Sequence, residues 1–297
     1  MRTFLWLIRR EMWENTAIWM LPALIGAALL LAALFGDIDL ASPAALSPPD
    51  QPPLGGALWL FGFGMVIFAI GWAYAAWYLL DGLYGERRDR SILFWRALPI
   101  SDVKTVFSKL AIALVVIPVV SYLIANVVTV GMALAVTVRA SSPNLRALLW
   151  KPQHWLELQV LWVYLIAAMG LWYFPVAGWL IAVSAWARKS VALWAVMPIL
   201  VPFLIERWLL HTHAIGTLVA NRFTGFLSVA FHNNADEAFS FAAVAGRTKG
   251  LTVPDRSIWE LINPVGLLAN TSTWIGVAVG GAFIVIAIEL RHRRVEQ

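Results

Sequence analysis

The chain has 297 residues, of which 61% are hydrophobic and 13% are charged, and its formal net charge is +5. Soluble globular proteins average about 25% charged residues, so this composition excludes an ordinary soluble domain and indicates an integral membrane protein. The absence of Cys excludes disulfides, thiolate metal sites and a cysteine nucleophile. The positive charge is typical of loops that face anionic membrane lipid, so we expect no nucleic-acid partner.

An amphipathic helix is predicted over residues 1–16. Apolar residues recur there at helical spacing, with charged residues between them: Phe4, Leu5, Ile8 and Met12 against Arg9, Arg10, Glu11 and Glu14. We expect an interfacial helix along the cytoplasmic face, the alternative being a short juxtamembrane segment without a role of its own. The charges interrupt any signal-peptide core, so the first span should remain in the mature protein.

Six apolar segments are long enough to cross a hydrocarbon core of about 30 Å as helices. The predicted spans cover residues 17–35, 57–80, 110–137, 160–186, 191–210 and 273–290. Only Ala187 to Ser190, "ARKS", separate spans four and five, which should therefore form an antiparallel hairpin. Prolines at positions 118, 175, 198 and 202 should kink or break their helices.

The predicted fold is an all-α integral membrane protein, one domain over residues 1–297 with six transmembrane helices. If the N-terminus is placed on the cytoplasmic side, most Lys and Arg fall in cytoplasmic segments, as is usual in membrane proteins. Both termini should therefore lie on the cytoplasmic side. The outer segment over residues 211–272 carries apolar residues at intervals of three and four between Ile215 and Ala230. We expect an amphipathic or re-entrant helix there, followed by a second apolar patch, "IWELINPVGLLAN".

Motifs for catalysis are not found. The sequence has no G-x-x-x-x-G-K-[ST] phosphate loop, no G-x-S-x-G elbow and no H-E-x-x-H pair, so we expect no catalytic residue, no metal and no cofactor in this chain. His211 and His213 stand two positions apart, which directs them to different faces of a helix, and we interpret them as an interfacial pair. The adjacent Asp236 and Glu237 are interpreted as a solvated turn.

Polar residues within the spans are few. Glu206, Arg207 and Glu289 lie near the predicted membrane edges, where long side chains can extend to water. Asn126 and Asn270 should make helix-to-helix hydrogen bonds. No residue is assigned to a substrate.

The stretch between spans two and three, residues 81–109, carries the strongest functional signal. It contains "YGERRDRSILFWRALPISDVKTVFSKL", in which basic residues surround the apolar run Ile92 to Trp95. A solvated loop would not need this apolar run. Ser101 is placed to cap a helix that continues into span three.

This stretch resembles the permease subunits of type-2 ABC exporters. The phrase E-R-x-x-x-[ST]-[IL]-x-[FL]-x-x-x-[LP]-P-[VI]-S-[DR] follows span two in that family, and this chain matches it with Glu86, Arg87, Ser91, Ile92, Phe94, Leu98, Pro99, Ile100, Ser101 and Asp102. The resemblance extends to the layout of nearly the whole chain: an N-terminal interfacial helix, six spans, a very short loop between spans four and five, and helical material before span six.

The resemblance implies a subunit of an exporter in a bacterial cytoplasmic membrane, surrounded by lipid. A separate ATPase, which binds ATP and Mg, would dock on the segment from about Glu86 to Leu98, and a second permease protomer, identical or different, would complete the path of an amphipathic or lipid-like substrate. The implied docking residues are Glu86, Arg87, Arg88, Arg90, Ser91, Ile92, Phe94, Trp95, Arg96, Pro99 and Ser101, with Arg188 and Lys189 as a second, smaller contact.

Three alternatives remain open. The stretch could be an ordinary positively charged cytoplasmic loop. The chain could be an ATP-independent transporter or channel, which predicts inverted repeats or buried ionisable residues. It could also be a membrane-embedded enzyme, which predicts paired carboxylates or a metal cluster within the spans. The sequence shows neither pattern, which favours the exporter.

Overall fold

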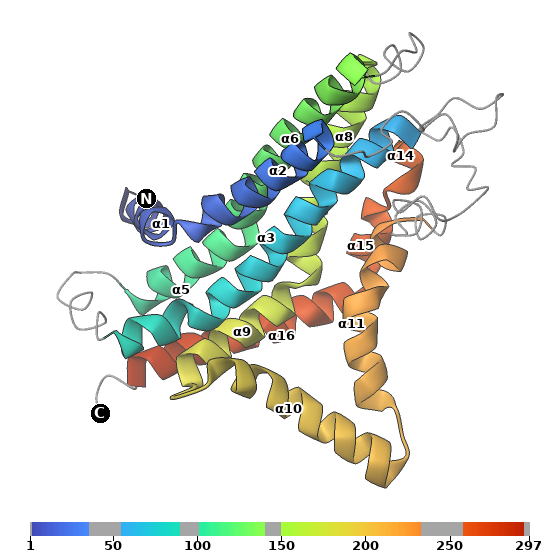
Figure 1. The fold of residues 1–297 in the computed structure, drawn as a ribbon. Coiled ribbons are helices and arrows are strands. Elements are labelled where there is room, and N and C mark those ends of the chain that lie inside the picture. Colours follow the sequence, from blue (N-terminus) through green and yellow to red (C-terminus); the bar gives the residue numbers. More distant parts are fainter. Residues whose placement is uncertain (1, 36–54, 90–100, 140–149, 233–257, 294–297) are drawn as a thin grey trace.

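The protein is all-α. A computed structural model describes residues 2–35, 55–89, 101–139, 150–232 and 258–293. Every named element in these ranges is helical (Figure 1). In chain order they are α1 (Arg2–Glu14), α2 (Ala17–Phe35), α3 (Gly55–Arg88), α5 (Asp102–Ala111), the π-helical turn η2 (Ile112–Val116), α6 (Ile117–Arg139), α8 (Pro152–Trp172), α9 (Phe174–Trp186), α10 (Val191–Ile205), the π-helical turn η3 (Glu206–Leu210), α11 (Ala214–Ala230), α14 (Ile258–Leu261), α15 (Pro264–Ala269) and α16 (Thr271–Arg293).

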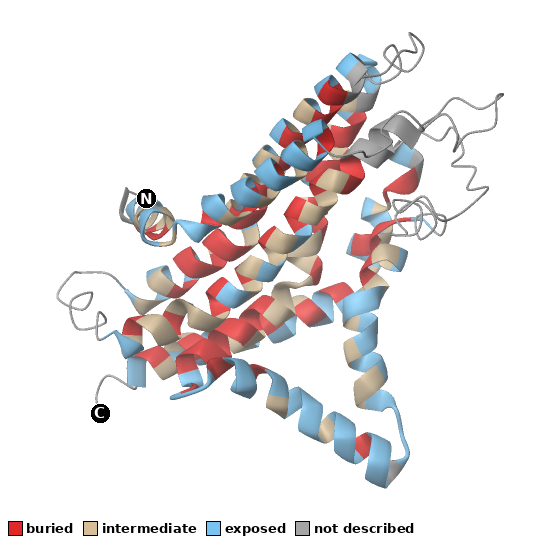
Figure 2. Ribbon diagram, in the orientation of Figure 1, coloured by how far each residue is buried: buried red, intermediate tan, exposed pale blue. Residues whose placement is uncertain are grey.

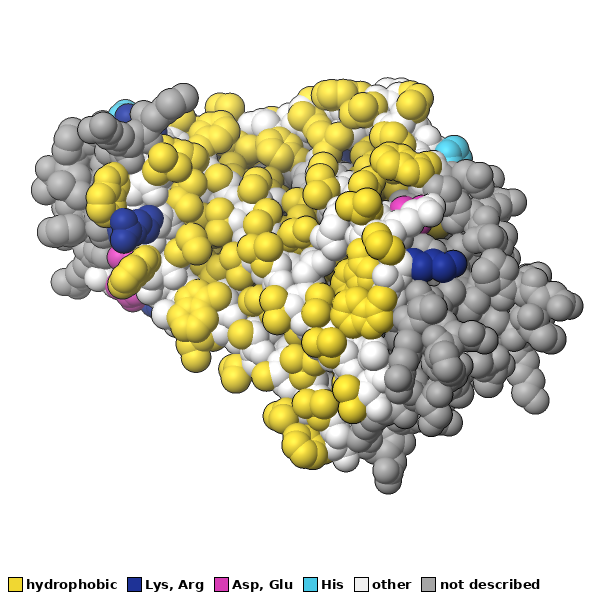
Figure 3. Space-filling model, turned by 90° about the horizontal axis from the view of Figure 1, so that it is seen from above, with side chains coloured by type: hydrophobic (Ala, Val, Ile, Leu, Met, Phe, Trp, Pro, Cys, Tyr) yellow, Lys and Arg dark blue, Asp and Glu magenta, His cyan; other side chains and the backbone are white. Residues whose placement is uncertain are grey.

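Six of the described helical segments are long and apolar enough to cross a membrane, which makes this a multi-pass membrane architecture. They comprise Ala17–Phe35, Phe61–Arg88, Asp102–Ala135, Trp155–Trp172, Val191–Leu209 and Thr271–Arg293. Hydrophobic side chains cover much of the described part of the face seen in Figure 3, and most of the charged side chains visible there lie toward its two ends. This distribution is what a hydrocarbon layer around the middle of the bundle requires.

Two hydrophobic clusters hold the bundle together. The first joins α2, α3, α6 and α8 around Phe68, Leu161 and Trp162. The second lies nearer the termini and joins α3, η2, α9 and α16 around Ile112 and Ile181. Figure 2 shows the buried residues concentrated in these helices, whereas α10 diverges from the bundle; α11 leads back to it and buries Phe226 and Ala230 near its end.

Close contact between α9 and α16 depends on glycine. A Cβ atom placed on Gly178 would lie 2.5 Å from the carbonyl oxygen of Gly280, and one on Gly280 would lie 2.6 Å from Phe174 Cδ1. The two backbones therefore approach to a distance that only residues without a side chain permit, as is common between membrane helices.

The predicted kinks are only partly observed. Predicted span four is interrupted at Tyr173, two residues before Pro175, and η2 directly precedes the helix that contains Pro118. Pro198 and Pro202, however, lie inside an unbroken α10. The helix therefore continues past both prolines, although each lacks a backbone donor.

Helical material precedes the last span, as expected. Helix α11 covers the predicted amphipathic segment, and α14 and α15 cover the second apolar patch. An antiparallel bridge pairs Phe231 with Ile262, and His232 N donates a hydrogen bond to Leu261 O at 3.0 Å. The end of α11 is thereby tied to the segment that leads into α16.

Candidate functional site

Five charged side chains from four helices meet at the end of the bundle where both termini lie. They are Glu11 of α1, Glu86 of α3, Asp102 and Lys109 of α5, and Arg291 of α16, and we call them the buried ion network. The exposed fractions are 3% for the Lys109 side chain, 6% for Arg291 and 8% for Glu86. Charges removed from water to this extent need partners.

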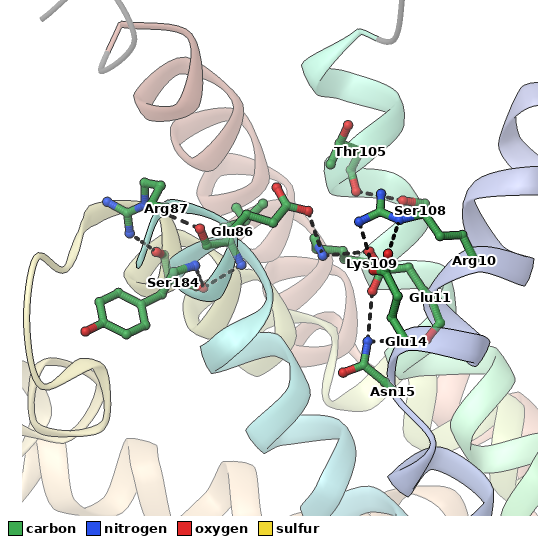
Figure 4. A network of polar contacts seen from close by, with 12 residues as sticks. Arg10, Glu11, Glu14, Asn15, Glu86, Arg87, Thr105, Ser108, Lys109 and Ser184 are labelled. Atoms are coloured by element: carbon green, nitrogen blue, oxygen red, sulfur yellow. Dashed lines mark hydrogen bonds and ion pairs between the residues drawn. The ribbon is translucent and has the colours of Figure 1, made fainter. Parts of the chain in front are cut away.

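Lys109 is the link between α1 and α3. Its Nζ lies 2.9 Å from Glu11 Oε1 and 3.0 Å from Glu86 Oε1, as Figure 4 shows from close by. Tyr78 donates a hydrogen bond from its hydroxyl to Glu11 Oε2 at 2.8 Å. The carboxylate of Glu11 therefore fastens the N-terminal helix α1 to α5 through Lys109 and to α3 through Tyr78.

Arg291 is the link between α3, α5 and α16. Its Nη1 donates to Glu86 Oε2 at 2.7 Å, and its Nε donates to Asp102 Oδ1 at 2.8 Å. Glu86 precedes and Asp102 follows the segment 90–100 in the sequence. One guanidinium from the last helix thus joins the two flanks of this segment, a geometry suited to the planar fork of Arg.

Arg87 fastens the end of α3 to the turn between α9 and α10. Its Nη2 donates to the carbonyl oxygens of Ser184 and Ala187, the latter at 3.0 Å. Ser184 Oγ in turn accepts the backbone N–H of Leu83 at 3.0 Å (Figure 4). A cation at the C-terminus of α9 also satisfies carbonyls that have no partner within that helix.

The short turn itself brings α9 and α10 together, as the predicted hairpin requires. Trp179 Nε1 donates to Ala195 O at 3.1 Å, and the rings of Trp186 and Trp194 lie 4.7 Å apart between centroids. Ser190 takes up a left-handed conformation, with φ of 51°. The two helices then diverge (Figure 1).

The predicted docking residues fall into three groups. Glu86 and Arg87 bond within the chain, so we infer that they position the neighbouring helices. Arg88, Ser101, Arg188 and Lys189 are exposed, and Ser101 caps α5 as predicted, accepting the Lys104 N–H at 3.4 Å. The rest of the set lies outside the described residues: Arg90, Ser91, Ile92, Phe94, Trp95, Arg96 and Pro99.

Sequence reasoning did not identify Glu11 as a site residue. It also missed the ion pairs that Lys109 makes with Glu11 and Glu86, and those that Arg291 makes with Glu86 and Asp102. In the sequence, both cations are part of the positive charge of the predicted cytoplasmic segments. The available signal was the presence of an acidic residue near the end of each partner helix, at Glu11, Glu86 and Asp102. Their distances along the chain, up to 205 residues between Glu86 and Arg291, hide the pairing from any local pattern.

Two expectations for polar residues are wrong. Glu206 does not extend to water; it is 4% exposed and accepts backbone N–H groups from Ala214, Ile215 and Gly216, because the first turn of α11 presents unpaired donors. Asn270 makes no helix-to-helix bond among the described residues and instead accepts the Ser272 N–H at 2.8 Å, at the start of α16.

The expectation for Asn126 is confirmed. Gln159 Nε2 of α8 donates to Asn126 Oδ1 of α6 at 2.8 Å.

Within the described ranges no three His, Asp or Glu side chains are placed to hold a metal ion. Of the two predicted interfacial histidines, His213 has its Nε2 atom 3.4 Å from Arg207 Nη1.

Comparison of the chain with models of known protein families, with curated proteins and with solved structures found no match. The function of the site therefore has to be inferred from its own residues and from the resemblance of the sequence after α3 to permease subunits of type-2 ABC exporters.

Proposed function

We propose that the chain is the membrane-spanning permease subunit of a type-2 ABC exporter. A separate ATPase subunit docks on the segment between α3 and α5, and the permease, paired with a second protomer, moves an amphipathic or lipid-like substrate out of the cytoplasm or inner leaflet. Both termini lie on the ATPase side of the bacterial cytoplasmic membrane. The ATP and Mg belong to the ATPase.

The observation that carries this proposal is the bridge made by Arg291. A force applied to the segment 90–100 enters the bundle through its two flanks, at Glu86 and Asp102. Because Arg291 bonds both carboxylates, α3, α5 and α16 have to move together. An ordinary solvated loop has no need of such a buried, three-helix connection, whose charges are costly to desolvate. Buried ionisable residues are also the pattern expected of an ATP-independent transporter, but these charges are paired with one another at the end of the bundle where both termini lie, not midway along the spans.

Two further contacts support the same interpretation. Lys109 extends the connection to α1, and Arg87 extends it to the α9–α10 turn that carries the exposed Arg188 and Lys189. Arg87 of the proposed primary contact thus bonds to Ala187, the residue that precedes the proposed secondary contact. The apolar run Ile92 to Trp95 supplies the anchor for the partner, and the surrounding Arg residues supply steering.

Affinity purification of the tagged chain with its ATPase tests the proposal. The wild-type chain, extracted in mild detergent from its native host, should retain a phosphate-loop protein and ATP hydrolysis that vanadate inhibits. Trp95→Ala should reduce both by about thirtyfold, since an aromatic anchor in an interface commonly contributes about 2 kcal/mol.

Trp77→Ala is the matched control, because Trp77 is 61% exposed on α3 within the apolar span. It should leave the recovered ATPase unchanged. Absence of any phosphate-loop protein from the wild-type preparation would refute the exporter, and equal recovery with Trp95→Ala would refute the docking segment.

A further inference from the structure

Helix α1 lies across the bundle and has one large exposed face. In Figure 1 it is seen nearly end-on, whereas α2 runs along the bundle. Leu7 and Glu11, one turn apart, face the bundle and are buried. The opposite side of the helix carries Leu5, Trp6 and Trp13, whose exposed fractions are 65%, 64% and 72%. On a helix that lies across the spans, such a face contacts the boundary between water and lipid.

Arg9 lies in the middle of this exposed face. Its Cζ atom is 5.4 Å from the ring centroid of Trp6 and 6.0 Å from that of Trp13, so one guanidinium is within cation–π range of two indole rings. The three residues stand at positions i, i+3 and i+7, which places them on one side of the helix. Neither ring supplies an oxygen acceptor for the N–H donors of the guanidinium.

The charges of α1 leave Arg9 available to an anion. Arg10 pairs with Glu14, its Nε lying 2.6 Å from Oε1, and Glu11 pairs with Lys109. Both carboxylates of the helix are thereby neutralised. The exposed guanidinium of Arg9 makes no ion pair or hydrogen bond with the residues that the structure describes. An anion that approaches this face therefore meets a cation and no unpaired carboxylate of α1.

The ion network fixes the direction in which this face points. Glu11 accepts hydrogen bonds from Lys109 and Tyr78, and Asn15, at the turn into α2, donates to Glu11 Oε2 at 3.2 Å. Rotation of α1 about its axis would break these bonds. The two indole rings and the guanidinium are therefore held away from the bundle before any ligand arrives, which lowers the cost of binding.

We propose that Trp6, Arg9 and Trp13 bind the head group of an anionic phospholipid of the surrounding membrane. The guanidinium donates two parallel hydrogen bonds to the phosphodiester, which its planar fork matches. The indole rings and Leu5 contact the glycerol backbone and the first methylenes of the acyl chains, at the level that Trp prefers in membranes.

Two features define the ligand. The exposed apolar side chains beside the cation fit an amphiphile better than a free phosphate. The cation itself favours a head with net negative charge over a zwitterionic head, whose ammonium it repels. The site does not rest on the proposed exporter function, because it is built from α1 and the contacts that orient this helix.

Native mass spectrometry of the full-length protein, freed of lipid in detergent, tests the proposal. The probes are dioleoyl phosphatidylglycerol and dioleoyl phosphatidylcholine, which share their chains and differ in head charge. We expect the first phosphatidylglycerol to bind about tenfold more tightly, because its hydrogen bonds with Arg9 are charge-assisted. Arg9→Gln should abolish this preference, and Arg9→Lys should restore part of it. Trp6→Leu combined with Trp13→Leu keeps the face apolar and should weaken phosphatidylglycerol binding about fivefold.

The matched control is Lys104→Gln, which removes one exposed cation of α5 on the same side of the membrane and should leave the preference unchanged. Glycerol 3-phosphate, a head without chains, should not displace the bound lipid. Equal binding of the two lipids by the wild type, an equal loss of preference in Arg9→Gln and Lys104→Gln, no effect of the two Trp substitutions, or displacement by glycerol 3-phosphate would overturn the proposal.

Photocross-linking in native membranes identifies what covers the face. Leu5→Cys places a single thiol beside the site in a chain that otherwise has none, and a maleimide benzophenone attached there should form adducts with phospholipid enriched in phosphatidylglycerol. Trp77→Cys, exposed within the apolar span of α3, should form lipid adducts without this enrichment. The same lipid composition at both positions, or a protein adduct at position 5, would contradict the lipid site and leave the ATPase docking at position 95 to its own test.

Discussion

At the scale of single residues, the protein pairs its buried charges so that Glu86, Lys109 and Arg291 each have two charged partners. Glu86 contacts both Lys109 and Arg291, and Lys109 contacts both Glu11 and Glu86. Burial makes such groups costly, but it also makes the removal of one member more costly than its retention. The network therefore specifies how four helices meet, whatever its net contribution to stability.

Replacement of Lys109 tests this dependence. Lys109→Met leaves Glu11 and Glu86 facing each other without the cation between them, so the free energy of unfolding should fall by about 3–5 kcal/mol. Unfolding followed by Trp fluorescence during SDS titration measures it.

The control for this measurement is Glu14→Gln, which breaks the Arg10–Glu14 pair on α1, where Glu14 is 48% exposed. That change should cost about 0.5 kcal/mol or less. Equal effects of the two substitutions would contradict the network described above.

At the scale of helices, the elements were largely predictable and their connections were not. The spans follow from apolar length, because a bilayer permits few alternatives, and Ser101 at the start of α5 follows from capping preference. Pro198 and Pro202 were expected to kink or break α10, and they do not break it, since the helix continues from Val191 to Ile205. Arg87 and Ser184 stand 97 positions apart, and only the packing of α3 on α9 brings them together.

The glycine contact between α9 and α16 gives a second prediction. Gly280→Ala adds a Cβ atom 2.6 Å from Phe174 Cδ1 and 2.9 Å from Phe174 O, so the helices must separate and the melting temperature should fall by several degrees. Gly281→Ala, one position along the same helix, meets nothing within 4 Å and should leave melting unchanged or raise it. A lower melting temperature for Gly281→Ala than for Gly280→Ala would contradict the contact.

The bridge made by Arg291 can be measured as a distance. The chain has no Cys, so Asp89→Cys and Val103→Cys introduce spin labels only at two exposed positions that flank the segment 90–100. Pulsed electron resonance should give a narrow distance distribution, and Arg291→Gln should broaden it. Arg293→Gln, at a position paired only with the exposed Glu289 in the described helix, should leave it narrow; equal widths in all three samples would show that Arg291 does not hold the flanks.

At the scale of the whole molecule, the structure combines a rigid connection at the termini with two loosely packed helices. The ion network joins α1, α3, α5 and α16, and Arg87 adds α9, whereas α10 leaves the bundle and α11 returns to it only at its far end (Figure 2). In the proposed exporter, motion of the docked ATPase would reach all five joined helices at once. The exposed α10 would then face lipid or a second protomer.

The most direct test of this account is cross-linking from position 95. Trp95→Cys creates a single thiol in a chain that otherwise has none, and a maleimide benzophenone attached there should, on illumination in native membranes, form an adduct with a phosphate-loop ATPase. The same reagent at Trp77→Cys should form none, because that exposed side chain lies within the apolar part of α3. An ATPase adduct at position 95 alone is the predicted result; no such adduct, or the same adduct from both positions, would contradict the proposed function.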